Sequence, residues 1–183
     1  STALIDDFYM DRVIRFIDIS NNTEISVVDH KGKKGSMAWS PDNVHLGFIA
    51  GADINDPTDG RLWVVSSKDG KPTALMADFK GKFDKLSWKD SKNMYFLASE
   101  GVWSTFGTIK RDGSNFERTV GGGGPIIKTY STSKDGACAF LVSSPSHPND
   151  IYYMKTGAKN PMRVTDINPL RTELKLAKQE VIT

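Results

Sequence analysis

Short apolar runs alternate with clusters of turn residues along most of the chain. The runs are rich in β-branched and aromatic side chains, which favours strands over helices. Signals that favour helices are scarce before residue 170. The pattern therefore predicts an all-β fold whose strands include the runs RVIRFIDI, EISVV, VHLGFIA, RLWVVSS, NMYFLAS, ACAFLV and DIYYMK.

Four hairpin turns recur along this series of strands, in the stretches ISNNTE, SKDGKP, KRDGSN and MKTGAK. When Asn21, Asp69, Asp112 and Thr156 are taken as equivalent positions, the turns are 48, 43 and 44 residues apart. Repeating units of this length with four strands each are typical of the blades of a β-propeller. The sequence therefore predicts a partial β-propeller of four-stranded antiparallel blades.

The repeat divides the chain into three complete blades, over residues 35–78, 82–121 and 125–166. Residues 1–34 supply only the outer hairpin of an incomplete blade, and residues 167–183 form an exit segment. The chain begins STALIDDF rather than with Met, and we interpret it as part of a longer protein. Because open propeller ends leave apolar blade faces uncovered, we expect the isolated chain to self-associate.

Three aspartates, Asp53, Asp56 and Asp59, form an acidic loop in the stretch GADINDPTDG, between the second and third strands of the first complete blade. A proline and a glycine follow two of them, and all three residue types are turn formers. A calcium loop of the EF-hand type requires ligands at alternate positions and a closing glutamate. Residues 63–67 offer no such acid. A structural loop is therefore preferred to a metal site.

The overall charge gives no reason to expect nucleic acid or a membrane as a partner. The 183 residues contain 24 Lys plus Arg and 22 Asp plus Glu, for a net charge of +2. The basic stretch HKGKK, residues 30–34, is interpreted as a solvated loop. The chain has no run of about 18 apolar residues that could span a bilayer. The compartment stays open between periplasm and cytoplasm, with a slight preference for the periplasm.

The residues that could carry chemistry lack the patterns that chemistry requires. The single cysteine, Cys138, excludes an internal disulfide and is expected to be a buried apolar side chain. No G-x-S-x-G stretch is present for a serine nucleophile. The histidines His30, His45 and His147 lie in a loop, a strand and a turn without metal-ligand spacing. We therefore expect no catalytic residue, metal or cofactor in this chain.

Two further features favour structural interpretations. The stretch GGGGP, residues 121–125, precedes the strand-like IIKTY rather than a helix, so a connection between blades is preferred to a phosphate loop. The tryptophans recur at strand positions and are expected to pack between blades rather than to stack on bases. They are Trp39, Trp63, Trp88 and Trp103.

Several stretches resemble the propeller of the prolyl oligopeptidase family of serine peptidases, in its acylaminoacyl-peptidase and dipeptidyl-peptidase-like branch. They are WSPDNVHLGFIAGADINDPTDGRLWVV, FLASEGVWSTFGTIKRDG and SSPSHPNDIYYM. The closing TDINPLRTELKLAKQEVIT is similar to the segment by which that family passes from propeller to hydrolase domain. The ordered set covers nearly the whole chain and is weakest over the first 30 residues.

The resemblance implies a parent protein that is a serine-type exopeptidase or oligopeptidase. Its propeller caps an α/β-hydrolase domain of the same chain, beyond residue 183, and limits which peptides reach the catalytic triad. Lys85 and Lys128, on predicted inner strands, are candidates for side chains that line the central channel; the alternative is that they lie at a blade end. The competing interpretation is a stand-alone propeller that binds another protein or a ligand.

Overall fold

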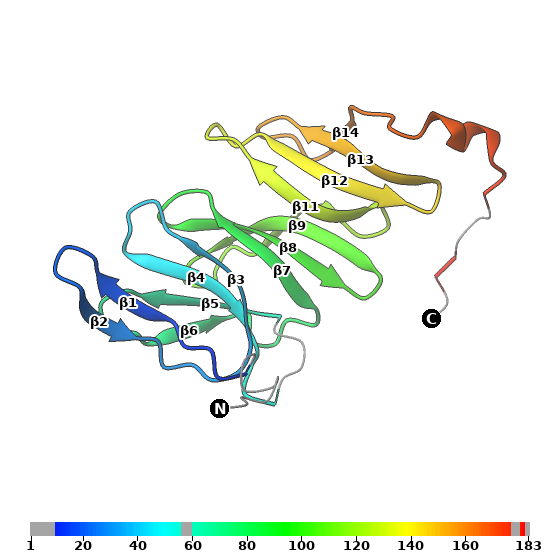
Figure 1. The fold of residues 1–183 in the computed structure, drawn as a ribbon. Coiled ribbons are helices and arrows are strands. Elements are labelled where there is room, and N and C mark those ends of the chain that lie inside the picture. Colours follow the sequence, from blue (N-terminus) through cyan, green and yellow to red (C-terminus); the bar gives the residue numbers. More distant parts are fainter. Residues whose placement is uncertain (1–9, 56–59, 177–179, 182–183) are drawn as a thin grey trace. The chain divides into compact units, whose positions relative to one another are not determined.

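The computed structural model describes residues 10–55, 60–176 and 180–181. Within them the elements are β-strands and one short 3-10 helix, and the strands form antiparallel sheets (Figure 1). The predicted all-β partial propeller is thereby confirmed. The first sheets contain β1 (Arg15–Asp18), β2 (Thr23–Val27), β3 (Lys34–Trp39), β4 (His45–Ala50), β5 (Arg61–Ser66) and β6 (Pro72–Leu75). The others contain β7 (Lys82–Trp88), β8 (Asn93–Glu100), β9 (Trp103–Lys110), β10 (Glu117–Gly121), β11 (Ile126–Thr132), β12 (Cys138–Ser144), β13 (His147–Met154) and β14 (Met162–Arg163).

Each sheet is a meander, in which strands that follow one another in sequence pair with one another. The strand orders are β1-β2, β3-β4-β5-β6, β7-β8-β9-β10 and β11-β12-β13-β14. The 3-10 helix Pro169–Glu173 follows the last strand. In the part of the chain that the structure describes, no helix has the length and hydrophobicity needed to span a membrane.

The four hairpin turns predicted to be equivalent share one backbone feature. The residue after each aligned position has a positive φ, which is 56° at Asn22, 64° at Gly70, 84° at Gly113 and 77° at Gly157. Glycine adopts this left-handed region without steric cost, and Asn tolerates it better than most residues. The turn alignment that revealed the repeat is therefore confirmed.

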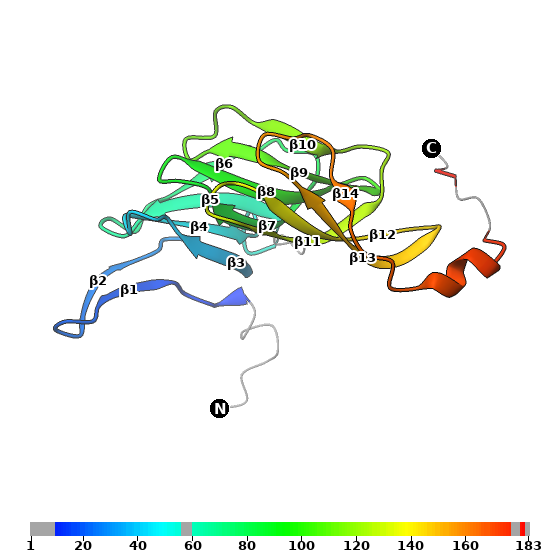
Figure 2. The same cartoon turned by 90° about the horizontal axis from the view of Figure 1, so that it is seen from above.

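The chain divides into two compact units, residues 1–96 with 108–116 and residues 97–107 with 117–183. In the first unit the β1–β2 hairpin lies beside the β3–β6 sheet (Figures 1 and 2). Its Phe16 is 3% exposed and belongs to one cluster with buried residues of β4 and β5, among them Phe48. A second aromatic cluster joins Phe79 and Phe83 with Phe96 and Phe116.

The second unit has its own aromatic centre. The Phe106 ring lies 4.9 Å from the rings of both Tyr130 and Phe140, in edge-to-face contacts. Cys138 is 1% exposed and packs as the small buried side chain that the sequence predicted. Residues 122–125 link β10, which ends at Gly121, to β11, so the glycine-rich stretch is a connection between two sheets as predicted.

Trp88 joins the face of the β3–β6 sheet to β7, as expected for a tryptophan that packs between blades. Its Nε1–H donates a 2.8 Å hydrogen bond to the carbonyl of Ala38. Replacing Trp88 with Phe keeps an aromatic ring but leaves this carbonyl without its donor, so we expect the free energy of unfolding to fall by about 1 kcal/mol. Urea unfolding measures the change. Trp39→Phe, at a side chain on a residue 48% exposed, is the control and should change stability by less than about 0.5 kcal/mol.

Candidate functional site

The acidic loop predicted from the sequence follows β4. Asp53 accepts a 2.7 Å hydrogen bond from the backbone N–H of Asn55, two residues later, which is the turn role expected for an aspartate in such a loop. Asp56 and Asp59 lie outside the described residues. Among the residues that the structure describes, no three His, Cys, Asp or Glu side chains gather as a metal site would require.

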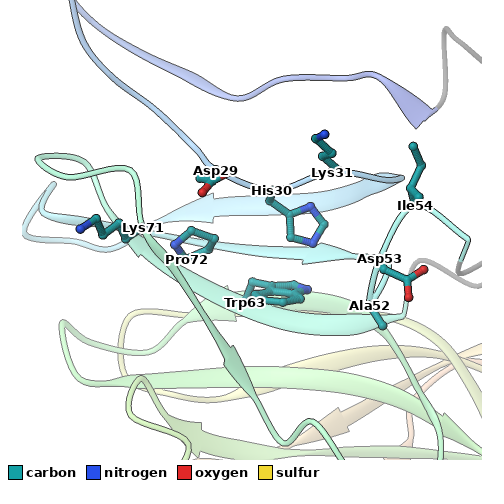
Figure 3. Close-up of a pocket in the computed structure, with 9 residues that line it drawn as sticks. All are labelled: Asp29, His30, Lys31, Ala52, Asp53, Ile54, Trp63, Lys71 and Pro72. Carbon is teal, nitrogen blue, oxygen red and sulfur yellow. The ribbon is translucent and has the colours of Figure 1, made fainter.

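A cavity of about 470 Å³ lies beside this loop, within the first unit (Figure 3). The connection from β2 to β3 supplies Asp29, His30 and Lys31 to its wall, and the loop after β4 supplies Ala52, Asp53 and Ile54. Trp63 on β5 and the neighbouring Lys71 and Pro72 complete the lining. The ammonium groups of Lys31 and Lys71 point away from Trp63 (Figure 3), and the carboxylates of Asp29 and Asp53 belong to the same lining.

His30 and Trp63 form the core of this cavity. Their rings lie 4.6 Å apart in an edge-to-face contact, and Trp63 stacks in turn on Phe48. His30 Nε2 lies 3.1 Å from the carbonyl of Gly51, and because a carbonyl only accepts, Nε2 carries the proton. Burial, reinforced by the positive charge of Lys34, lowers the pKa of His30. The imidazole is therefore neutral at pH 7.

The basic stretch at residues 30–34 is not the solvated loop that the sequence suggested. Lys34 is 8% exposed, and its Nζ donates to the carbonyls of His30 and Gly32. Burial lowers the pKa of Lys34. Gly32 has a φ of 96°, and a Cβ there would lie 2.5 Å from the carbonyl oxygen of Asp53. The loop folds tightly on the acidic loop, and Lys34 satisfies carbonyls that this packing buries.

The polar atoms of the His30 and Trp63 side chains are ring nitrogens. The described lining contains no serine, threonine or cysteine that the neutral His30 could activate as a nucleophile. Two ring nitrogens, Nδ1 of His30 and Nε1–H of Trp63, are buried and make no hydrogen bond in the described part of the chain. From the sequence, His30 was expected only to be a loop residue. The one sequence signal for this cluster was Trp63, an aromatic residue in the predicted strand RLWVVSS.

Lys85 and Lys128 both lie on the first strand of their sheets, β7 and β11. Lys85 is half-buried and Lys128 is exposed. Lys128 occupies a bulge in β11, because Ile127 pairs with Val142 while Thr129 pairs with the adjacent Leu141. A bulge turns a side chain away from the regular alternation of a strand, so the direction of Lys128 could not be deduced from the sequence.

A buried carboxylate, which the sequence analysis did not identify, holds the residues that lead into the exit segment. Asp150 on β13 is 1% exposed. Its Oδ2 lies 2.6 Å from Nη2 of Arg163, and its Oδ1 accepts hydrogen bonds from the hydroxyl of Thr165 at 2.9 Å and the N–H of Ile167 at 3.1 Å. Burial raises the pKa of Asp150, but these hydrogen bonds and the guanidinium outweigh burial and hold the pKa below its usual value. The chain is thereby held against β13 as it leaves the sheet.

The two other histidines have structural partners. His45 lies on β4, as predicted for a strand residue, and its Nδ1 is 3.0 Å from Nη1 of Arg111. His147 begins β13 rather than lying in a turn, and it is 8% exposed. Its Nδ1–H donates to the carbonyl of Pro148, and its Nε2 lies 3.0 Å from the hydroxyl of Tyr152.

No family model matches the sequence. No curated protein matches it either. Solved structures do match. The chain is similar to a puromycin-hydrolysing peptidase of Mycobacterium tuberculosis, with a TM-score of 0.63 and 16% identity over 82% of this chain and 24% of that one. It is similar to the AtxE2 isopeptidase, with a TM-score of 0.60 and 13% identity over 85% and 25% of the two chains.

A structure from a study of two prolyl endopeptidases matches with a TM-score of 0.59 and 15% identity, over 86% of this chain and 25% of that one. The chain therefore spans about a quarter of the length of each of these proteins. These three neighbours are peptidases of the prolyl oligopeptidase family that contain β-propeller domains, and TolB of Acinetobacter baumannii and an oligogalacturonate lyase match with similar TM-scores of 0.59 and 0.61. In fold, this chain is similar to the propeller portions of those peptidases.

Proposed function

We propose that this chain is a propeller segment of a serine peptidase of the prolyl oligopeptidase family. It is itself non-catalytic and controls which peptides reach a hydrolase domain outside residues 1–183. The observation that carries the proposal is the likeness in fold to the propeller portions of several such peptidases. The stretches that resemble the family's propeller agree with it.

The exit segment supports a continuation of the chain. Arg163, Thr165 and Ile167 are fastened to Asp150, and aliphatic side chains among and after these residues are exposed. Several exposed aliphatic side chains close together in the sequence are typical of a surface that another domain or protein covers. They are Val164, Ile167, Leu170, Leu174 and Leu176, on residues between 48% and 68% exposed. A domain that follows the propeller would supply that surface.

The mass of the native protein in its source cells tests the proposal, with an antibody raised against this chain as the probe. We expect a band several times heavier than the 183-residue chain that is labelled by a serine-reactive fluorophosphonate. A native band of the size of this chain would overturn the gating role and favour the stand-alone interaction module.

Gating by inner-strand lysines predicts a charge-dependent selectivity of the parent enzyme. Lys128→Glu reverses an exposed charge on the first strand of its sheet. Two unit charges about 4 Å apart in water interact by about 1 kcal/mol, and the reversal changes this interaction in opposite directions for acidic and basic peptides. We therefore expect kcat/KM for acidic over basic peptides to fall by at least about fivefold. Peptide hydrolysis at low salt measures this ratio. Lys155→Glu, at an exposed lysine after β13, is the control, and an equal change in both variants would argue against channel lining by Lys128.

A further inference from the structure

A second cavity, of about 530 Å³, lies within the unit of residues 97–107 and 117–183. Its wall is largely apolar. Val102 and Trp103 come from the β8–β9 turn and the start of β9, Ile126 begins β11, and Pro145 lies in the β12–β13 turn. A cavity of this volume has room for a leucine or phenylalanine side chain together with part of its backbone.

This cavity lies at the end of the β11–β14 sheet toward which the exit segment runs. Ile126, at the start of β11, pairs with Ser143 near the end of β12. The residues that lead into the exit segment run along β13 toward the start of that strand. Val164 N–H donates to the carbonyl of Ile151, and Ile167 N–H donates to the carboxylate of Asp150. In an antiparallel sheet β11 and β13 begin at the same end. Residues 163–167 therefore run toward the end of the sheet at which the cavity lies.

The chain itself places an aliphatic side chain at this cavity. Val181 lines it and is 50% exposed, although it is 55 residues from Ile126 in the sequence. Ser143 and Glu180 line the same wall and can bond the backbone of a ligand, whereas the Ser144 hydroxyl already bonds Ser146. Val181 thus contributes an aliphatic side chain to the wall.

We propose that this cavity binds the apolar side chain of a peptide substrate and so contributes to selection of large aliphatic or aromatic residues. The role of this cavity in substrate selection rests on the proposed function, because peptides are substrates only if the parent protein is a peptidase. The binding itself is a property of residues 97–107 and 117–183 and is measurable on this chain alone.

The test follows the indole N–H signals of the chain in two-dimensional NMR, with Trp103 assigned by the Trp103→Phe variant. N-acetyl-leucinamide should move the Trp103 signal saturably and bind at least fivefold more tightly than N-acetylglycinamide, because only the former has a side chain to bury. Ile126→Ser and Val102→Ser should each weaken binding at least twofold. Val181→Ser should weaken binding by a similar factor, because it removes an aliphatic group from the same wall. Ile25→Ser, at an exposed isoleucine on β2, is the control.

A Trp103 signal that stays in place overturns the inference, as does equal binding of the glycine compound or an equal effect of Ile25→Ser. Val102 is 60% exposed in a turn, so its variant keeps the test informative if Ile126→Ser fails to fold. The antibody and fluorophosphonate experiment is independent of this one. Saturable binding with a native band of the size of this chain would overturn the peptidase assignment and leave a cavity that recognises apolar side chains.

Discussion

Replacing Asp150 with Asn should lower the melting temperature of this chain by on the order of 5 to 10 °C, because it breaks a buried ion pair and leaves the Arg163 guanidinium with the half-exposed Asp166 carboxylate as its counter-charge. The carboxylate is 1% exposed and holds Arg163, Thr165 and Ile167 at once. Asn has a similar shape, so the loss reports on charge and hydrogen bonding rather than on a cavity. Thermal unfolding followed by circular dichroism at pH 7 measures the effect.

Asp166→Asn is the matched control. Its Oδ1 lies 2.6 Å from the same Nη2 atom of Arg163, but the Asp166 side chain is 49% exposed. An exposed ion pair is screened by water and contributes little, so this variant should melt within about 2 °C of the original chain. Equal effects of the two substitutions would contradict a special role of the buried carboxylate.

The pH dependence follows from the lowered pKa of Asp150. A carboxyl group whose pKa is lower in the folded chain than its unfolded value of about 3.9 stabilises the fold above that value. The stabilisation is lost as the pH falls through the folded pKa. The difference in melting temperature between the original chain and Asp150→Asn should therefore be full at pH 7 and should shrink below about pH 4. A difference that stayed constant down to pH 2 would be inconsistent with an ionised Asp150.

The repeat was accessible from the sequence because it depends on local rules. A turn that needs a positive φ selects Gly or Asn, and the alternation of apolar residues identifies the strands on either side. Asn22, Gly70, Gly113 and Gly157 were therefore aligned correctly without any knowledge of the sheets. The same reasoning found the turn role of Asp53, whose partner is only two residues away.

Features that depend on contacts between residues far apart in the sequence were harder to predict from the sequence. Asp150 lies in the stretch SHPND, which is typical of a turn, and its partners come 13 to 17 residues later. One signal was available, because Asp150, Tyr152 and Met154 alternate along β13, and Asp150 and Met154 are both buried. A carboxylate on the buried side of a strand requires a partner. The solvated loop predicted around Lys34 was wrong for the same reason, since the carbonyls that Lys34 satisfies are brought together only by the fold of the loop.

Replacing Gly70 with Ala should destabilise the chain by roughly 2 to 3 kcal/mol. The left-handed φ of 64° costs a residue with a Cβ about 1 to 2 kcal/mol. A Cβ there would also lie 2.2 Å from the carbonyl oxygen of Val27, a backbone atom that no side-chain rotation can move away. The β1–β2 hairpin would have to shift, and the hydrogen bond from Asp29 N–H to the Gly70 carbonyl would be lost, at a cost of about 1 kcal/mol.

Gly157→Ala separates the two contributions. Gly157 occupies the equivalent turn of the last sheet, with a φ of 77°, and a Cβ there would meet nothing within 4 Å. It should therefore show only the backbone cost of about 1 to 2 kcal/mol. Urea unfolding of both variants gives the comparison. The fluorescence of Trp39, whose ring packs edge-on against Phe16 of the hairpin, reports whether the hairpin has moved. If both substitutions cost the same, the hairpin adapts to the added methyl group at position 70 without loss. A larger loss of unfolding free energy for Gly70→Ala means that the turn at Gly70, unlike the equivalent turn at Gly157, also holds the β1–β2 hairpin in place.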